Sequence, residues 1–291
     1  MDDTHERACS GIDLDDRSPC FNHGPHVFVI DRDLSRASIW NYERVTVHPA
    51  GLELLHLHRR TVFSFDSRGL MVHENDPRKS RGKRFSMTGC SEGNLIVIRD
   101  DVSELASRAL ERLAANEPPL SGHDSTPRGL HDYLSTLGEE EQVNAGLFGY
   151  LWTFPKVVPS TCEAKLVISG SIESARLLER WVDTMPVALV ERGFRQPADL
   201  WEPWCVAVVA DKVASIAQTV RTGSGGAEVG VDTAPEFRGR GLAAGSTAGW
   251  SRHPALAGVT LFYSASRTNE SSSRVTDRLG LTFVGSTFAI S

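Results

Sequence analysis

The sequence predicts an α+β protein whose C-terminal half forms a mixed, mostly antiparallel sheet flanked by helices, with a further α+β domain before it. Its 291 residues are enough for one large domain or two ordinary ones. Several apolar runs alternate with polar residues and end at turn residues, as β-strands do, and segments with helical spacing lie between them. We expect an N-terminal extension at residues 1–30, an α+β domain at 31–155 and a second domain at 156–291.

The N-terminal half predicts helices and hairpins in alternation. Its elements, in order, are a short strand and a helix in 45–60, hairpins at 61–75 and 83–100, helices at 101–119 and 130–137, and a strand at 144–160 that joins the two halves. The helix at 101–119 is the clearest, since a proline pair ends it. Its buried face is expected to carry Leu105, Ala109, Leu110 and Leu113.

The C-terminal half predicts a helix followed mainly by strands. The helix at 171–182 is expected to bury Ile172, Ala175, Leu178 and Val182. The elements after it are a hairpin at 204–220, a strand at 227–234, a helix at 242–251, a strand at 258–266, a helix at 269–280 and a last strand or strand pair at 281–290.

Charge and hydropathy narrow the classes of partner. The formal net charge is −6, so the chain has no excess of cations with which to neutralise nucleic-acid phosphates. It also lacks a run of about 18 apolar residues, so we expect no membrane partner. The acidic first residues lack the apolar core of a secretory signal, and we expect a cytoplasmic protein.

Cysteine and histidine usage does not predict a metal site. The five cysteines are Cys9, Cys20, Cys90, Cys162 and Cys205. An odd number without close pairs is unlike a disulfide framework or a zinc site, although a Cys9–Cys20 bridge is conceivable. His56 and His58 lie two positions apart in a predicted helix, so their side chains do not share a face and are unlike a pair of metal ligands.

The most informative segment is PEFRGRGLAAG at 235–245, where a predicted strand passes into a predicted helix. Gly239 and Gly241 allow the backbone to curl so that successive N–H groups point into one concavity. A helix N-terminus with unpaired N–H groups is an anion site suited to phosphate. Arg238 and Arg240 add positive charge in a geometry that fits phosphate oxygens. The segment therefore predicts a pyrophosphate-binding loop.

Two other nucleotide motifs do not fit this segment. The Gly-x-Gly-x-x-Gly fingerprint fails because Ala244 stands at its third glycine, and no Gly-Lys-Ser/Thr of a P-loop is present. An ordinary strand-to-helix turn with solvated arginines remains the alternative, since short glycine-rich matches are common.

The stretch Arg238-Gly239-Arg240-Gly241-Leu242-Ala243 matches the Arg/Gln-x-x-Gly-x-Gly/Ala signature of the GNAT superfamily of acyl-CoA-dependent N-acyltransferases. Residues 227–243 resemble that family's fourth strand and pyrophosphate loop. Residues 261–281 resemble its fifth strand and following helix, with Asn269 near the end of the strand. The expected order of elements over 165–291 is also that of the family, whereas the N-terminal half carries no such signature.

The resemblance implies that acetyl-CoA lies in a V-shaped gap between those two strands and that a neutral amine attacks its thioester directly, without a metal. The implied cofactor contacts are the N–H groups of Arg238, Gly239, Arg240, Gly241, Leu242 and Ala243 on the pyrophosphate, Val231 and Thr233 along the pantetheine arm, and Asn269 and Ser272 on the arm or the pyrophosphate.

The resemblance also suggests catalytic residues. Glu228 is the candidate general base, because the family often places a glutamate on this strand and burial would raise its pKa toward neutrality. A plain surface glutamate is the alternative. Thr276 stands where many members carry the tyrosine that protonates the leaving thiolate. Tyr263 or Ser264 is therefore the candidate for that role.

These features together predict an N-acetyltransferase that moves an acetyl group from acetyl-CoA to a primary amine. We expect the N-terminal domain to pack on the C-terminal one and help close the acceptor site. Two alternatives remain: a non-catalytic acyl-CoA-binding or regulatory module, and an interaction protein whose N-terminal domain binds a macromolecular partner. Neither the acceptor amine nor the oligomeric state follows from the sequence.

Overall fold

The computed structural model describes residues 51–139, 148–159 and 162–291. The extension expected at 1–30, the strand expected before residue 51, Cys9 and Cys20 lie outside these residues. The elements of the N-terminal half are α1 (Gly51–Val62), β1 (Phe63–Phe65), β2 (Met71–Glu74), β3 (Phe85–Cys90), β4 (Gly93–Ile98), α2 (Glu104–Ala115), α3 (Leu130–Leu137) and β5 (Phe148–Thr153). Both expected hairpins are confirmed, because β1 pairs with β2 and β3 with β4 in antiparallel register.

The elements of the C-terminal half follow the expected order. They are β6 (Lys165–Ile168), α4 (Ile172–Glu179), α5 (Trp181–Thr184), α6 (Val187–Glu191), the 3₁₀ turn η2 (Pro197–Asp199), β7 (Trp204–Val209), β8 (Lys212–Gly223), β9 (Gly226–Thr233), the 3₁₀ turn η3 (Pro235–Phe237), α7 (Leu242–Ser251), the 3₁₀ turn η4 (Pro254–Leu256), β10 (Thr260–Ser266), α8 (Glu270–Leu279) and β11 (Thr282–Ile290). The β7–β8 hairpin turns through Ala210 and Asp211, which both have positive φ.

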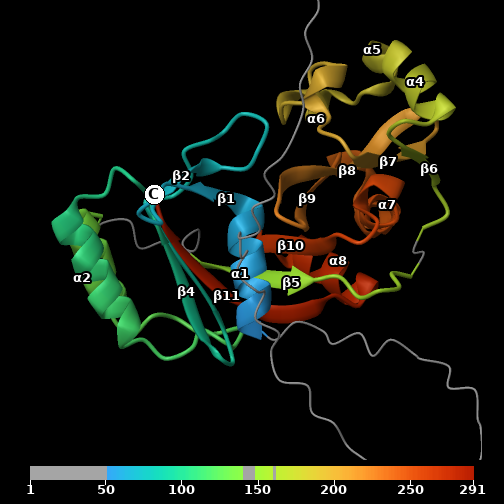
Figure 1. The fold of residues 1–291 in the computed structure, drawn as a ribbon. Helices are drawn as coiled ribbons and strands as arrows, with labels where there is room; N and C mark the ends of the chain where they lie inside the picture. The colour runs from blue at the N-terminus through green and yellow to red at the C-terminus, as the bar shows by residue number, and fades with distance from the viewer. Residues whose placement is uncertain (1–50, 140–147, 160–161) are drawn as a thin grey trace, which may run out of the picture. The chain divides into compact units, whose positions relative to one another are not determined.

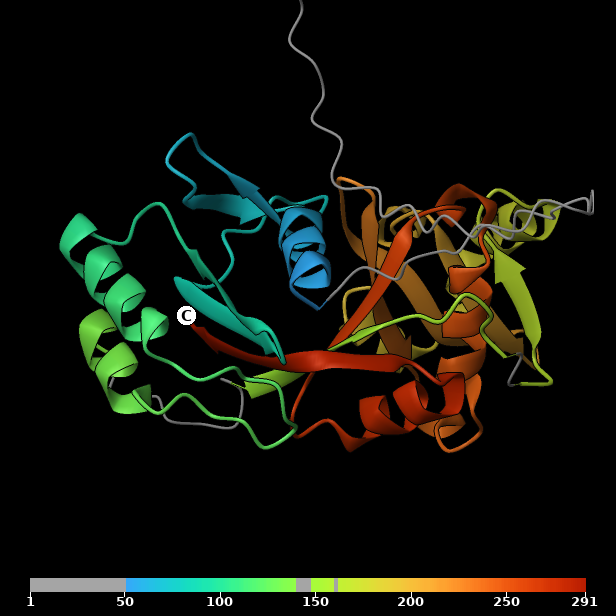
Figure 2. The same cartoon turned by 60° about the horizontal axis from the view of Figure 1, so that its bottom comes forward.

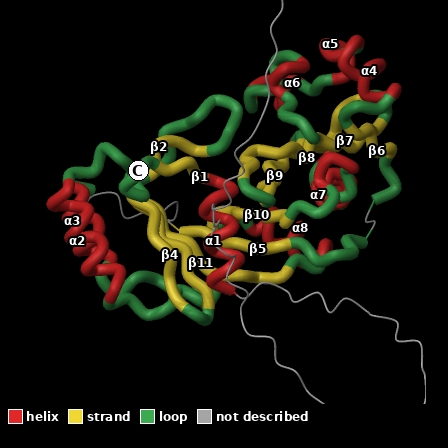
Figure 3. The backbone as a smooth tube through the Cα atoms, viewed as in Figure 1, coloured by secondary structure: helices red, strands yellow, loops and turns green. Residues whose placement is uncertain are grey.

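Apart from the β1–β2 pair, the strands form one nine-stranded sheet in the order β4-β3-β11-β5-β10-β9-β8-β7-β6 (Figures 1 and 3). All neighbouring strands are antiparallel except β9 and β10. Helices from both halves pack on this sheet. The predicted fold class, α+β with a mostly antiparallel sheet flanked by helices, is therefore confirmed.

Strand β5 links the two halves of the chain, as expected of the aromatic segment from which it comes. It lies in the sheet between β10 and β11, which are the last two strands of the chain. The domain boundary expected after residue 155 falls between β5 and β6, which belong to the same sheet. The division into two functional parts stays a prediction.

The two faces of the sheet carry different helices, because successive residues of a strand point to opposite sides. Ala227 and Val229 of β9 belong to a buried cluster with Trp250 of α7. Phe262 of β10 packs instead with Leu55 of α1. Figure 2 shows α1 (blue) and α8 (red) on opposite faces of the sheet. A site between β9 and β10 is thus bordered by α7 and α8 on one side and by α1 on the other.

Two expected helix faces are wrong in part. In α2 the expected Leu110 is buried and Leu113 packs against the same cluster, but Leu105 is 79% exposed and Ala106 packs inward instead. Ile172 and Val182 are also exposed. The expected single helix is broken at Arg180 into α4 and α5, and Trp181 is turned inward in their place.

Candidate functional site

Strands β9 and β10 run parallel and then separate. Their pairing ends at Val229 and Tyr263. Beyond this point β9 pairs only with β8, as far as Thr233, and β10 only with β5, as far as Ser266. The second half of β9 therefore has no strand partner on its β10 side. The result is a V-shaped gap with backbone hydrogen-bonding groups of β9 along one edge.

The segment 235–245 lies at the open end of this gap. Gly239 and Gly241 have φ values of +77° and +76°, in the left-handed region that glycine enters without steric cost. Gly241 is the N-cap of α7, and no side chain caps the helix. The first bond back into the loop joins the Gly245 N–H to the Gly241 carbonyl at 3.0 Å.

The N–H groups of residues 239–244 consequently have no hydrogen-bond acceptor in the described part of the chain. A run of such groups at the positive end of a helix dipole favours a negatively charged ligand. We refer to residues 239–244 as the N–H cradle.

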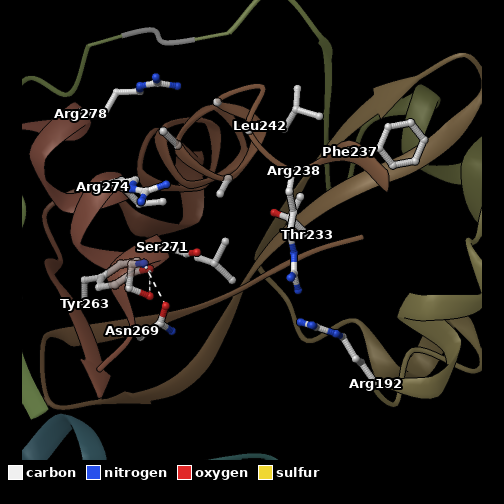
Figure 4. Close-up of a pocket in the computed structure, with 17 residues that line it drawn as sticks. Arg192, Thr233, Phe237, Arg238, Leu242, Tyr263, Asn269, Ser271, Arg274 and Arg278 are labelled. Atoms are coloured by element: carbon white, nitrogen blue, oxygen red, sulfur yellow. Dashed lines mark hydrogen bonds between the residues drawn. The ribbon is translucent and has the colours of Figure 1, made fainter. Parts of the chain in front are cut away.

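The N–H cradle opens into a pocket of about 590 Å³ bordered by β9, β10, α7 and α8. Its described lining includes Arg192, Arg238, Arg274 and Arg278 and contains no aspartate or glutamate. In Figure 4, Arg192 and Arg238 extend toward one another, while Arg274 and Arg278 follow α8. Arg192 binds the Asp232 carboxylate at 2.7 Å, and Arg274 faces Glu270 at 3.4 Å. The excess of positive charge suits a ligand with several phosphates.

Two uncharged side chains organise the inner end of this pocket. The Asn269 side-chain oxygen caps α8 by accepting the Ser272 N–H at 3.1 Å. The Tyr263 hydroxyl donates to Ser272 Oγ at 3.1 Å (dashed lines in Figure 4). Burial is the main cause that raises the pKa of Tyr263, and the phenol therefore stays protonated at neutral pH.

The structure brings nearly all the expected cofactor residues to this one pocket. The expected residues that line it are Val231, Thr233, Arg238, Gly239, Gly241, Leu242, Ala243, Asn269 and Ser272. The exception is Arg240, whose guanidinium lies over the Phe237 ring, 5.8 Å from its centroid, and does not line the pocket. Arg240 belongs to the N–H cradle through its backbone N–H alone.

Glu228 lies on the opposite face of β9 and is only 1% exposed, so the surface-glutamate alternative is wrong. Arg221 Nη1 donates to its Oε2 at 3.1 Å, and the Ser264 hydroxyl donates to its Oε1. His58 of α1 places Nε2 3.8 Å from the same Oε1. Arg221 also binds the Glu74 carboxylate at 2.6 Å. These residues come from α1, β2, β8, β9 and β10.

The expectation that burial raises the pKa of Glu228 is also wrong. Burial acts in that direction, but the contacts with His58, Arg221 and Ser264 outweigh it and lower the pKa to about 2. The carboxylate is therefore ionised at neutral pH and is by itself a weak proton acceptor.

The arginine-lined pocket and the residues around Glu228 meet where β9 and β10 separate. Tyr263 and Ser264 are successive residues of β10, so they point to opposite faces. Tyr263 faces the arginine-lined pocket, and Ser264, which is exposed, contacts Glu228 on the α1 face. A ligand in the arginine-lined pocket can thus reach the inner end of the gap from the Tyr263 face, and a second molecule can approach the same point from the α1 face.

Several site residues were missed from the sequence. Arg274 and Arg278 carry a detectable signal, because they lie four apart on one face of a helix that follows Asn269. Arg192, Arg221 and the Glu74 carboxylate have no local signal, since only the packing of distant elements brings them to the site.

Comparisons with solved structures give distant matches. A protein of Novosphingobium aromaticivorans assigned to the GNAT family aligns at 21% identity and a TM-score of 0.36, over 48% of this chain and 61% of that one. A GNAT-family acetyltransferase of Colwellia psychrerythraea aligns at 13% identity and a TM-score of 0.37, over 68% of this chain and 76% of that one. A GCN5-related N-acetyltransferase of Kribbella flavida aligns at 17% identity and a TM-score of 0.36, over 55% of this chain and 62% of that one.

This chain therefore spans less than two thirds of the Novosphingobium and Kribbella proteins. No family model matches it, and no curated protein does. Because these TM-scores all lie below 0.5, the matches by themselves assign no activity.

No helix in the part of the chain that the structure describes is long and apolar enough to cross a bilayer. No group of three or more His, Cys, Asp or Glu side chains in the same residues is arranged to hold a metal ion.

Proposed function

We propose that this protein is an N-acetyltransferase that moves an acetyl group from acetyl-CoA to a primary amine. The observation that carries the proposal is the N–H cradle at the mouth of the gap between β9 and β10. Its unpaired donors, positive φ glycines and surrounding arginines fit a pyrophosphate. The unpaired N–H groups at 241–244 are those of any helix start, and the loop residues Gly239 and Arg240 extend the run to six.

The residues present fit the pyrophosphate and the pantetheine arm of coenzyme A. The N–H groups of 239–244 and Arg238 would hold the pyrophosphate, and Arg278, which has no ion pair in the described chain, offers a further phosphate contact. The unpartnered edge of β9 from Val231 to Thr233 would bind the amide groups of the pantetheine arm. Bound acetyl-CoA would supply an acetyl group activated as a thioester.

The chain's own residues would then position the reactants and move protons. The backbone of β9 at the gap offers N–H groups to the carbonyl oxygen on which negative charge develops. Tyr263 remains protonated and is the candidate donor to the departing thiolate, with Ser272 holding its hydroxyl in place. Ser264 and Glu228 border the face from which the amine would approach.

One observation favours the non-catalytic alternative. Thr276, which stands where many members of the superfamily carry the tyrosine that protonates the thiolate, is 2% exposed, and its hydroxyl donates to the Ser273 carbonyl at 2.8 Å. A chain that kept the N–H cradle but lost proton transfer would bind acyl-CoA without turning it over.

The two functions are separated by amine-dependent thiol release. The full-length protein is mixed with acetyl-CoA and a panel of small primary amines, and thiol release and the mass of each amine are followed. Acetylated amine with stoichiometric thiol supports the enzyme. Acetyl-CoA binding in calorimetry without turnover of any amine supports the binding module, and absence of binding contradicts both.

A further inference from the structure

Helix α1 brings one imidazole to the buried carboxylate of Glu228. His58 Nε2 is 3.8 Å from Glu228 Oε1, too far for a hydrogen bond but within ion-pair distance. This nitrogen is buried and has no hydrogen-bond partner among the described residues. A buried polar atom without a partner is costly and asks for an explanation. The neighbouring His56 is exposed, so the two histidines do point apart.

The surroundings pack against this ring but provide no hydrogen-bond partner for its Nε2. The His58 ring meets the Phe262 ring edge-on, with centroids 5.0 Å apart. The side chain is 12% exposed although Nε2 is covered, so its accessible part lies elsewhere on the side chain. A proton taken up at Nε2 would therefore face Glu228.

The ring faces a small network of charged groups. The charged groups near this point on the elements packed against α1 are Glu228 of β9 and Arg221 of β8, with Glu74 of β2 beyond Arg221. The packed strands β1, β3 and β4 carry no charged residue. Glu228 is ionised and faces the ring directly, with its Oε1 3.8 Å from His58 Nε2.

Glu228 itself is poorly suited to keep a proton. Arg221 binds its Oε2, which stabilises the negative form. Its Oε1 lies between the exposed Ser264 hydroxyl and the buried His58 nitrogen. A proton arriving from the acceptor face through Ser264 would thus be passed on rather than retained.

We propose that His58 is the final acceptor of the amine proton, reached through Ser264 and Glu228; this inference rests on the proposed acetyl transfer. As the amine nitrogen bonds to the acetyl carbon, its N–H bond breaks and the proton moves to Ser264 Oγ. The Ser264 hydroxyl proton moves to Glu228 Oε1, and Glu228 gives a proton to His58 Nε2. Serine and carboxylate are restored, and the imidazolium later loses its proton to solvent.

The assignment gives the N-terminal half a role in the chemistry. His58 belongs to α1, outside residues 156–291, so the expected acetyltransferase domain alone would lack its proton acceptor. His58 acts through Glu228 and Ser264 and is not expected to touch the acetyl group.

The test compares His58→Gln with His56→Gln in the full-length protein. Glutamine keeps a polar side chain but does not titrate. For both variants, kcat and kcat/KM with the best amine of the panel are measured by thiol release from about pH 5.5 to 9, and acetyl-CoA affinity is measured by calorimetry. His58→Gln should lower kcat at neutral pH by about tenfold or more and alter the acidic limb of the profile, with unchanged acetyl-CoA affinity. His56→Gln should behave as the wild type.

A wild-type profile and rate in folded His58→Gln overturns the proposal while leaving the acetyltransferase intact. A wild-type protein that acetylates no amine defeats the proposed function, and the role of His58 with it. If His58→Gln does not fold, imidazole NMR of the wild type decides instead, with the ring identified by its contact with Phe262. The signal should change with pH and respond to Glu228→Gln; a ring that keeps one protonation state over the whole range overturns the assignment.

Discussion

The buried carboxylate of Glu228 offers a stability measurement that is independent of activity. Its pKa is lowered from 4.5 to about 2 in the folded protein. Each unit corresponds to about 1.4 kcal/mol, so the ionised carboxylate contributes on the order of 3 kcal/mol to the free energy of unfolding. Because the folded-state pKa is the lower one, this stabilisation is present in full above pH 4.5 and is lost as pH falls toward 2.

Glu228→Gln should therefore lower the free energy of unfolding by about 3 kcal/mol at pH 7 and by progressively less below pH 4.5. Urea unfolding followed by circular dichroism at pH 7, 5, 4 and 3 measures this difference. Glu270→Gln is the matched control, because the Glu270 side chain is 85% exposed and its pair with Arg274 should be worth less than about 1 kcal/mol. A difference for Glu228→Gln that does not change with pH would refute the reasoning.

Three further predictions follow from the site. Gly239→Ala forces alanine into φ +77° and should cost roughly 1–2 kcal/mol and weaken CoA binding. Gly170→Ala, at φ +75° and outside the pocket lining, should cost the same and leave CoA affinity unaltered in calorimetry. Tyr263→Phe should reduce kcat in the thiol assay by about 100-fold with little change in CoA affinity, and an unchanged kcat would exclude Tyr263 as the acid. Arg221→Met removes the arginine that two carboxylates share and should destabilise the fold by about 3–5 kcal/mol at pH 7 but less at pH 3; equal losses at both would contradict the network.

The elements and the N–H cradle were predictable because their signals are local. Alternation, turn residues and helix caps lie within a few positions of one another, as in the loop around Gly239 and Gly241. The chemistry of that loop also follows from the residues themselves, since glycine at positive φ before a helix exposes N–H groups wherever it occurs.

The surroundings of Glu228 were not predictable, because they depend on packing between distant elements. Arg221 and Glu74 are 147 positions apart in the chain, and His58 approaches from a helix that no motif connects to β9. These neighbours lower the pKa of Glu228, whereas burial alone, the only effect considered from the sequence, would raise it. The predicted buried face of the helix at 171–182 was wrong for a related reason. The helix breaks at Arg180, so Trp181 is buried and Val182 is exposed.

The most direct test of the central claim is the affinity of CoA for Arg238→Glu, measured by calorimetry beside the wild type. Arg238 lines the pocket next to the N–H cradle, whereas Arg240 lies over Phe237, outside the pocket lining, so Arg240→Glu is the control of equal charge change. If the N–H cradle holds the pyrophosphate, Arg238→Glu should abolish measurable CoA binding and Arg240→Glu should retain most of it. Wild-type affinity in Arg238→Glu would contradict the assignment.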